Sequence, residues 1–306
     1  MKNKYLFVLL MLICIALGGL GLTGVYVSRQ DQRDQEQNLT VVTSFYPMYI
    51  AAMNVIGDTP GVTLENLSEP QTGCLHDYQL TPEDMKLLST ADVFIVNGGG
   101  IETFLTDVAK SYPDLQIIYG GENVEMLDDN AHVWMNMEDY KIQVETIANK
   151  LAEADSAHAS QYAANAEAYC GRIQVLCNRA RALREQIQGE PVGIFHEAYA
   201  YVAQEYGLEV VGSMDLDEER QVSAGEVAEI LNVIEEYHVP VVLAEQLYGE
   251  SMGNTVEGES DAQVVYLDPL TRGNYEKDSY LDAMENNMEL LEKAFEQHSH
   301  EGHDHG

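Results

Sequence analysis

The chain contains 306 residues, with 51 Asp and Glu against 16 Lys and Arg, so its formal net charge is −35. This charge excludes proteins that bind nucleic acid or anionic lipid, because both partners repel an acidic surface. Hydrophobic residues make up 45% of the chain, which is ordinary for a globular protein, and the length allows one or two domains. The excess carboxylates therefore lie on a solvated surface that attracts cations.

The N-terminus has the pattern of an export signal. Two lysines precede a long apolar run, and no acidic residue occurs before Asp31. We predict a signal peptide or an N-terminal membrane anchor over residues 1–27, since the apolar run is long enough to cross a bilayer. A polar spacer follows over 28–38. The protein is therefore expected to be exported, either anchored at the outer face of the cytoplasmic membrane or secreted into the cell envelope.

Strand-like and helix-like runs alternate in the first half of the remaining chain. Residues 82–90 are predicted to form a helix that has Thr81 as N-cap and Pro82 in its first turn. Short apolar or β-branched runs predict strands at 39–44, 62–67, 93–96 and 115–119. Repeated βα units of this kind favour a parallel sheet covered by helices.

A single long helix is predicted to separate this half from a second one. Apolar or small residues recur every three or four positions from Tyr162 to Ile187, which indicates a helix of about 45 Å with one narrow buried stripe. Gly189 and Pro191 end it. The same alternation then resumes, and Ser223 with Glu226 forms a capping box before another helix.

These patterns predict an α/β fold with two lobes, each a parallel β-sheet flanked by helices, joined by one long rigid helix. The predicted divisions are an N-terminal lobe over 39–157, the linking helix over 158–188 and a C-terminal lobe over 189–296. Cys170 and Cys177 lie seven positions apart on the linking helix, too far for a disulfide with each other. A disulfide between Cys74 and one of them stays open at this point.

Three histidines are candidates for a metal site between the lobes. His76 and His132 lie in loops of the first half, and His196 follows a predicted strand of the second. Taken singly, each is better explained as an ordinary surface or core histidine than as a metal ligand. However, α/β proteins bind ligands at strand ends that face a cleft. Neutral imidazoles suit zinc, with manganese and copper as weaker candidates. No zinc-protease helix, nucleophile elbow or phosphate-binding loop is present.

The chain from Val41 to about Leu291 resembles the zinc and manganese solute-binding proteins of bacterial ABC importers, called cluster A-I. The matching segments keep their order and spacing along nearly the whole mature chain. They are Ser44-Phe45-Tyr46-Pro47, His76-Asp77-Tyr78-Gln79-Leu80-Thr81-Pro82, Asn97-Gly98 with Gly100-Ile101-Glu102, His132-Val133-Trp134, Phe195-His196 with Tyr201, Tyr206-Gly207-Leu208, and Leu267-Asp268-Pro269-Leu270.

The resemblance implies that His76, His132 and His196 are metal ligands. Manganese-type relatives usually have Glu at the third position, so His196 is typical of the zinc class. For the fourth ligand, manganese-type relatives place an Asp near the last strand end, where Asp268 fits, whereas several zinc relatives use a Glu a few positions later, where this chain has Thr271. We choose Asp268, with Glu245 at the end of the preceding predicted strand as second choice. The structural alternative for Asp268 is a turn residue before proline.

The far C-terminus contains four further histidines among polar and acidic residues. We predict a flexible His-rich tail over 297–306 that collects zinc weakly, because this composition cannot pack a core. These histidines are His298, His300, His303 and His305.

The sequence and the resemblance together predict a protein that captures Zn²⁺ outside the cell and delivers it to the membrane permease of an ABC importer. We expect a monomer that binds no nucleic acid and is not an enzyme, with Zn²⁺ as the transported ligand in preference to Mn²⁺. The alternatives are a manganese-binding homologue, a surface adhesin with the same fold, and a zinc hydrolase built on the same ligands.

Overall fold

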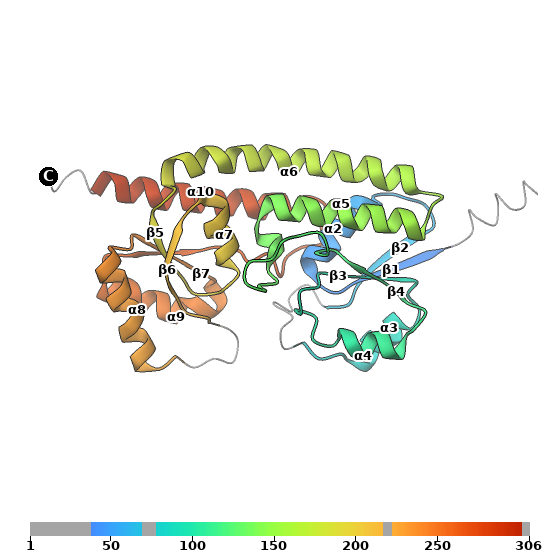
Figure 1. The fold of residues 1–306 in the computed structure, drawn as a ribbon, viewed down its shortest axis with the longest axis horizontal. Helices are drawn as coiled ribbons and strands as arrows, with labels where there is room; N and C mark the ends of the chain where they lie inside the picture. The colour runs from blue at the N-terminus through green and yellow to red at the C-terminus, as the bar shows by residue number, and fades with distance from the viewer. Residues whose placement is uncertain (1–37, 69–77, 217–221, 302–306) are drawn as a thin grey trace, which may run out of the picture.

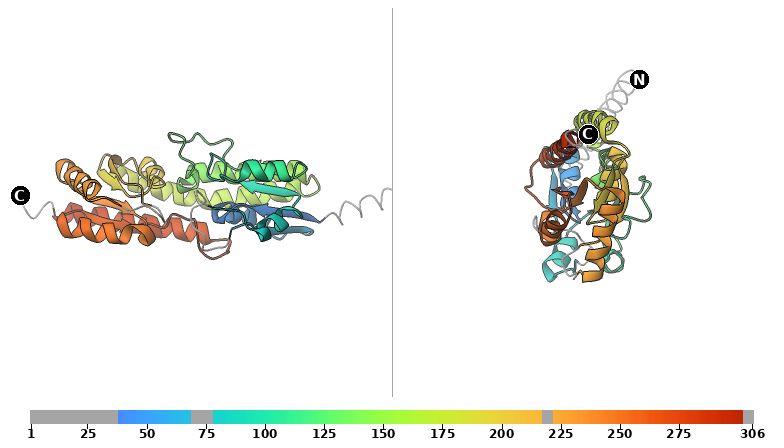
Figure 2. Two further views of the ribbon diagram at one scale, coloured as in Figure 1. Left: turned by 90° about the horizontal axis from the view of Figure 1, so that it is seen from below. Right: turned by 90° about the vertical axis from the view of Figure 1, so that its left-hand side faces the viewer.

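A parallel β-sheet lies at the centre of each half of the molecule in the computed structural model, which describes residues 38–68, 78–216 and 222–301. Figure 1 shows the two halves side by side, with one long helix running across both. The views in Figure 2 show an elongated molecule that is narrow when seen from its end. This architecture confirms the predicted α/β fold with two lobes.

The sheet of the N-terminal lobe contains four parallel strands in the order β2-β1-β3-β4. The strands are β1 (Leu39–Thr43), β2 (Val62–Asn66), β3 (Val93–Val96) and β4 (Gln116–Tyr119). The helices of this lobe are α2 (Tyr46–Ile56), α3 (Pro82–Leu88), α4 (Leu105–Ser111) and α5 (Met137–Ala154). In Figure 1, α2 and α5 lie on the side of the long helix and α3 and α4 on the opposite side. All four residues of β3 are buried, as expected for a strand that is covered on both faces.

The C-terminal lobe repeats this topology with the strand order β6-β5-β7-β8, again all parallel. Its strands are β5 (Pro191–Ile194), β6 (Glu209–Ser213), β7 (Val241–Ala244) and β8 (Gln263–Tyr266). Its helices are α7 (Tyr199–Tyr206), α8 (Ala224–Tyr237), α9 (Gln246–Glu259) and α10 (Ser279–Glu301). In each sheet the chain moves to one side after the first strand and to the other side after the third. The carboxyl ends of these two neighbouring strands therefore form the crevice where such folds bind ligands.

The long helix α6 (Ala159–Ile187) joins the lobes, within the range predicted for the linking helix. Its 29 residues correspond to about 44 Å. It packs on α2 and α5 at one end and on α7 at the other. The stripe that it buries follows the predicted spacing and comprises Tyr162, Ala166, Tyr169, Cys170, Ile173, Cys177, Ala180, Leu183 and Ile187.

A second connection between the lobes was not foreseen from the sequence. After β8 the chain crosses back to the N-terminal lobe, where the Tyr46 hydroxyl donates to the Asn274 carbonyl (2.9 Å) and the Tyr275 ring lies 4.2 Å from that of Tyr49. Helix α10 then returns along α6, held by an ion pair of 2.9 Å between Arg179 and Glu285. The lobes are thus joined twice, on the same side of the molecule (Figure 1).

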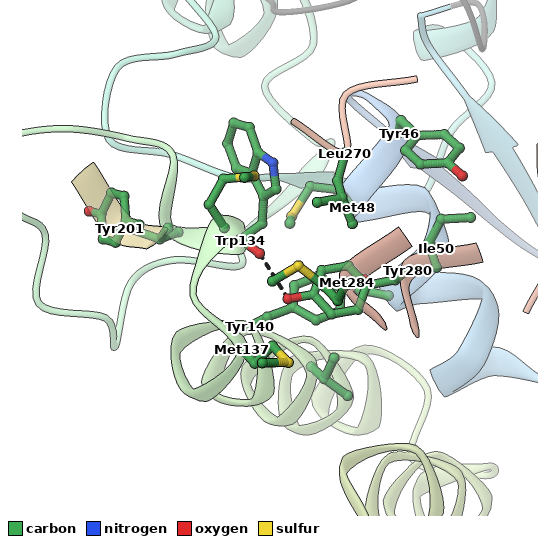
Figure 3. Close-up of a cluster of buried hydrophobic side chains, with 14 of the residues drawn as sticks. Tyr46, Met48, Ile50, Trp134, Met137, Tyr140, Tyr201, Leu270, Tyr280 and Met284 are labelled. Carbon is green, nitrogen blue, oxygen red and sulfur yellow. Dashed lines mark hydrogen bonds between the residues drawn. The ribbon is translucent and has the colours of Figure 1, made fainter. Parts of the chain in front are cut away.

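Buried aromatic side chains fill the junction between the lobes (Figure 3). The rings of Tyr140 on α5 and Tyr280 on α10 stack with centroids 3.7 Å apart. The Tyr280 hydroxyl donates to the Trp134 carbonyl, and the Trp134 indole N–H donates to the carbonyl of Pro269, both at 2.9 Å. The main hydrophobic core includes residues of both sheets, so the lobes share one core, and a shared apolar interface opposes their separation.

Two of the helix starts predicted from the sequence are present in the structure. Thr81 and Asp84 form a capping box at the start of α3, and Ser223 and Glu226 form one at the start of α8. Helix α9 was missed because its glycines lower helix propensity. One of them has a packing role: a Cβ on Gly253 would lie 2.2 Å from the Tyr266 hydroxyl oxygen, so glycine lets α9 approach β8.

The two cysteines of α6 are buried, free thiols, which agrees with the prediction that they do not form a disulfide with each other. Cys74 and the export segment over 1–27 lie outside the described residues. Within the ranges that the structure describes, none of the helices combines the length and apolarity that a bilayer span requires.

Helix α10 continues to Glu301, whereas a flexible tail was predicted from residue 297. The helix extends because no breaker occurs between Phe295 and Gly302. The rest of the predicted tail lies outside the described residues.

Candidate metal centre

His196 lies at the carboxyl edge of the second sheet, two residues after β5 ends. The chain bends there before α7 begins, and the Ala198 N–H donates to the Nδ1 atom of His196 (3.1 Å). In this geometry the neutral ring carries its proton on Nε2. Coordination of a cation through Nε2 would therefore require the ring to turn and release this bond. The side chain is only 8% exposed.

His132 lies in the N-terminal lobe, directly before a single 3-10 turn, η1 (Val133–Met135). It is fully buried. Its Nδ1 atom lies 2.8 Å from the side-chain oxygen of Asn130 and 3.3 Å from a carboxylate oxygen of Glu197. Both neighbours are acceptors, so Nδ1 carries the proton and Nε2 holds the lone pair that a metal ion needs.

The two imidazoles come from different lobes and lie next to each other. Their ring centroids are 4.9 Å apart, with an interplanar angle of 89°. Two imidazoles that bind one tetrahedral zinc ion with Zn–N bonds of about 2.0–2.1 Å have their centroids about 5 Å apart. The separation of His132 and His196 therefore fits a shared cation. Trp134 and Tyr199 flank the pair, with centroids 5.1 Å from His132 and 6.3 Å from His196, respectively.

Asp268 lies two residues after β8, in the segment that crosses back to the N-terminal lobe. One carboxylate oxygen, Oδ1, accepts the N–H of Leu270 (2.7 Å), and Leu270 has a left-handed backbone with φ 54°. The turn role considered for this residue is thus present. This hydrogen bond engages one of the two carboxylate oxygens of Asp268. Burial raises the pKa of Asp268, against the Leu270 bond and the positive charge of Arg272.

Glu245, the second choice for the fourth ligand, follows β7 and forms an ion pair with Arg272. Its Oε1 atom lies 2.8 Å from the Arg272 guanidinium, and the two side chains are 11% and 25% exposed. Burial raises the pKa of Tyr199 well above its ordinary value, and the charges of Glu245 and Asp268 raise it further. The Tyr199 hydroxyl donates to the carbonyl of Leu267 (2.9 Å), the residue before Asp268, and the Leu267 N–H donates to the carbonyl of Ala244 (2.9 Å), the residue before Glu245. Both carboxylates therefore belong to the C-terminal lobe near Tyr199.

His76 lies in the segment 69–77, outside the described residues. Across the ranges that are described, no three side chains of His, Cys, Asp or Glu form a group arranged to hold a metal ion. The structure thus brings together His132 and His196 and places Asp268 and Glu245 near Tyr199, whose ring flanks His196. The complete ligand set of His76, His132, His196 and Asp268 stays a prediction.

A buried network below His132 supports the loop that presents it. The Glu102 carboxylate accepts the backbone N–H groups of Asn97 (2.7 Å) and Gly98 (3.0 Å) and the Ser44 hydroxyl (2.8 Å). The Asn97 amide in turn donates to the carbonyl of Ala131 (2.9 Å), next to His132. Burial raises the pKa of Glu102, and these hydrogen bonds oppose the rise.

Several residues that shape the centre were not singled out from the sequence. Asn130, Glu197 and Arg272 are polar residues in loops, where such residues are common. Glu102 and Asn97 stood in matching segments of the chain, but only the tertiary structure shows that the one accepts the backbone N–H of the other.

The chain is similar to known metal-binding proteins over nearly its whole length. The family model for "Zinc-uptake complex component A periplasmic" matches residues 41–294. The manganese-binding lipoprotein MntA of Halalkalibacterium halodurans is 26% identical over 97% of this chain and 100% of its own length. The high-affinity zinc uptake system protein ZnuA of Bacillus subtilis is 25% identical over 84% of this chain and 87% of its own.

A solved structure agrees with the fold. The solute-binding protein FpvC of P. aeruginosa, in complex with Ni²⁺, has a TM-score of 0.77 and 26% identity, and the match covers 85% of this chain and 97% of that one. Two of these three proteins are named for manganese and zinc, and the third was solved with Ni²⁺.

Proposed function

Because the chain belongs to the family of zinc-uptake complex component A, we propose that it captures Zn²⁺ between its two lobes and delivers it to a membrane permease. This family comprises metal-binding proteins of ABC uptake systems outside the cytoplasm. The family consists of solute-binding proteins rather than enzymes. The proposal concerns the identity of the ion, the residues that hold it and the delivery step.

The observation that most supports this proposal is the pair His132 and His196. Each lobe supplies one imidazole, and the centroid separation of 4.9 Å suits one shared ion. We propose His76 and Asp268 as the remaining ligands, and Glu245 as the alternative to Asp268. Arg272 favours Asp268, because a carboxylate already paired with a guanidinium must give up that pair before it binds a cation.

The donor set supports zinc over manganese. Two or three imidazoles with one carboxylate form a site rich in nitrogen, and nitrogen donors suit zinc, whereas manganese prefers oxygen. Since one similar protein is named for manganese, a direct competition between the two ions is the decisive comparison.

The experiment measures Zn²⁺ and Mn²⁺ affinities of metal-free protein by competition with a chromogenic chelator. We expect one tight zinc site, at least 100-fold tighter than the manganese site, that is lost in His132→Ala and His196→Ala. His158→Gln is the matched control, because His158 pairs with Asp155 (2.7 Å) at the turn between α5 and α6. Tighter binding of Mn²⁺ than of Zn²⁺ would establish the manganese alternative.

Delivery needs a separate measurement in cells. A strain lacking the protein should take up zinc slowly at low external concentrations and recover with the wild-type protein but not with His196→Ala. A deletion strain with normal zinc uptake would contradict the transport role.

A further inference from the structure

Asn130 lies where the loop before His132 meets the C-terminal lobe, and its amide contacts both lobes. The side-chain oxygen accepts the backbone N–H of His132 (3.0 Å) and lies 2.8 Å from Nδ1 of the same residue. The side-chain nitrogen donates to the carbonyl of Glu197 (2.8 Å), the residue after His196.

These partners define the orientation of the amide. A backbone N–H can only donate, so it must face the amide oxygen, and the Glu197 carbonyl can only accept, so it must face the amide nitrogen. Because the amide oxygen cannot donate, the Nδ1 atom of His132 must carry the proton. Asn130 therefore selects the tautomer of His132 that has its lone pair on Nε2.

We propose that Asn130 is a positioning residue of the metal centre, which orients His132 for coordination and ties it to the backbone beside His196. The inference rests on the proposed function. It goes beyond that function because it explains the short distance between the two imidazoles by a direct link between the lobes, formed by the Asn130 side chain. The link joins the backbone of His132 to the residue after His196, so it holds the two imidazoles close together as a pair.

The backbone around Asn130 is held in a conformation that such a role requires. The two residues before it, Asp128 and Asp129, both have left-handed backbones, with φ of 44° and 63°. Aspartate tolerates this region better than most residues, but two in succession persist only where surrounding contacts hold them. The N–H of Asn130 donates to the Leu127 carbonyl (2.7 Å) and closes the turn.

Tyr201 on α7 supplies the contacts that hold this turn from the other lobe. Its hydroxyl donates to the Asn130 carbonyl (2.6 Å) and accepts the Leu127 N–H (3.1 Å). Both partners are backbone groups of the turn, so Tyr201 fixes the position of the turn relative to α7. The Asn130 amide fixes the orientation of the His132 ring.

Three variants test the assignment. Asn130→Ala removes both amide contacts, whereas Asn130→Asp keeps an acceptor for His132 and loses the donor to Glu197. The matched control is Asn123→Ala, because Asn123 lies in the same loop and its amide donates to the Thr146 hydroxyl (3.1 Å), away from both histidines.

Each variant is compared with the wild-type protein in three measurements. Zinc affinity reports the loss of ligand orientation, the visible spectrum of bound Co²⁺ reports coordination geometry, and the rate of zinc release to excess chelator reports the link between the lobes. Near-UV circular dichroism verifies that each variant is folded.

We expect Asn130→Ala to bind zinc 10–100-fold more weakly, with an altered cobalt spectrum. Asn130→Asp should recover the wild-type spectrum but release zinc at least threefold faster, and Asn123→Ala should match the wild type. Should Asn130→Ala fail to fold, Asn130→Asp alone decides through its spectrum and release rate.

The inference is overturned if Asn130→Ala binds zinc within threefold of the wild type. It is also overturned if Asn130→Asp shows the spectrum of the alanine variant or releases zinc at the wild-type rate. A wild-type protein that binds neither Zn²⁺ nor Co²⁺ would instead remove the proposed function, so the two failures are distinct.

Discussion

We expect Glu205 on α7 to make the stability of the junction between the lobes dependent on pH. Its Oε1 atom accepts the N–H of Met137 (3.2 Å), the first residue of α5. It borders a cavity of about 600 Å³ that Glu138, Asp139 and Arg184 also line. Burial raises the pKa of Glu205 from 4.5 to about 8, and the neighbouring charges of Glu138 and Asp139 add to the rise.

The direction of the effect follows from proton binding. The folded protein holds the Glu205 proton more tightly than the unfolded chain, so the favourable contribution is complete below pH 4.5 and is lost as the pH rises through about 8. A shift from 4.5 to about 8 corresponds to a loss of at most about 5 kcal/mol. Partial access of solvent screens the carboxylate, and we expect about 2 kcal/mol.

Glu205→Gln tests this prediction, because glutamine still accepts the Met137 N–H and cannot ionise. The free energy of unfolding is measured in urea between pH 5 and 9, in the presence of a chelator, from the fluorescence of the single tryptophan. The variant should gain stability over the wild type as the pH rises, by about 2 kcal/mol at pH 9. The exposed Glu209→Gln serves as control. A difference between Glu205→Gln and wild type that does not change with pH would refute the reasoning.

Four further predictions concern the metal centre, the tail and the surface charge. His196→Ala should lower zinc affinity by orders of magnitude with unchanged far-UV circular dichroism, because the side chain lies at the sheet edge; wild-type affinity would remove it from the site. Asp268→Asn should weaken zinc binding by at least tenfold and Glu245→Gln by less than threefold, since Arg272 occupies Glu245; the reverse order in a chelator competition would exchange their roles. Deleting 297–306 should leave one tight site and abolish only weaker binding in a zinc titration at pH 7.5; loss of the tight site would mean that the tail supplies a ligand. Raising NaCl from 0.05 to 0.5 M should raise the Tm by several degrees, because salt screens the repulsion within a chain of net charge −35; a constant Tm in differential scanning calorimetry would show that this repulsion is unimportant.

Arg272 acts on both candidates for the fourth ligand of the proposed metal centre. Its guanidinium pairs with Glu245, and its positive charge opposes the rise that burial causes in the pKa of Asp268. In the proposed site Arg272 would occupy Glu245 and leave Asp268 as the oxygen donor, and a site with few oxygen donors favours zinc.

The local elements and the fold class were accessible from the sequence because they depend on short-range patterns. The capping boxes at Thr81 and Ser223 lie within one helical turn, and the buried stripe of α6 repeats every three or four residues. Alternation of strands and helices requires parallel sheets with crossover connections. Helix α9 was not predicted because its glycines lower helix propensity, although one of them, Gly253, lets the helix pack closely on β8.

The candidate histidines were also visible from the sequence, because imidazoles next to turns and strand ends are unusual and their chemistry is specific. The sequence could not determine that His132 and His196 lie 4.9 Å apart, since 63 residues, including the helices α5 and α6, separate them along the chain. It could not reveal Asn130, whose role depends on a left-handed turn and on a carbonyl of the other lobe. Nor could it reveal the ion pair of Arg272 with Glu245. Residue type and short-range periodicity determined the elements and the kind of chemistry, whereas distances and partners between the lobes depend on packing across long separations, which only the tertiary structure decides.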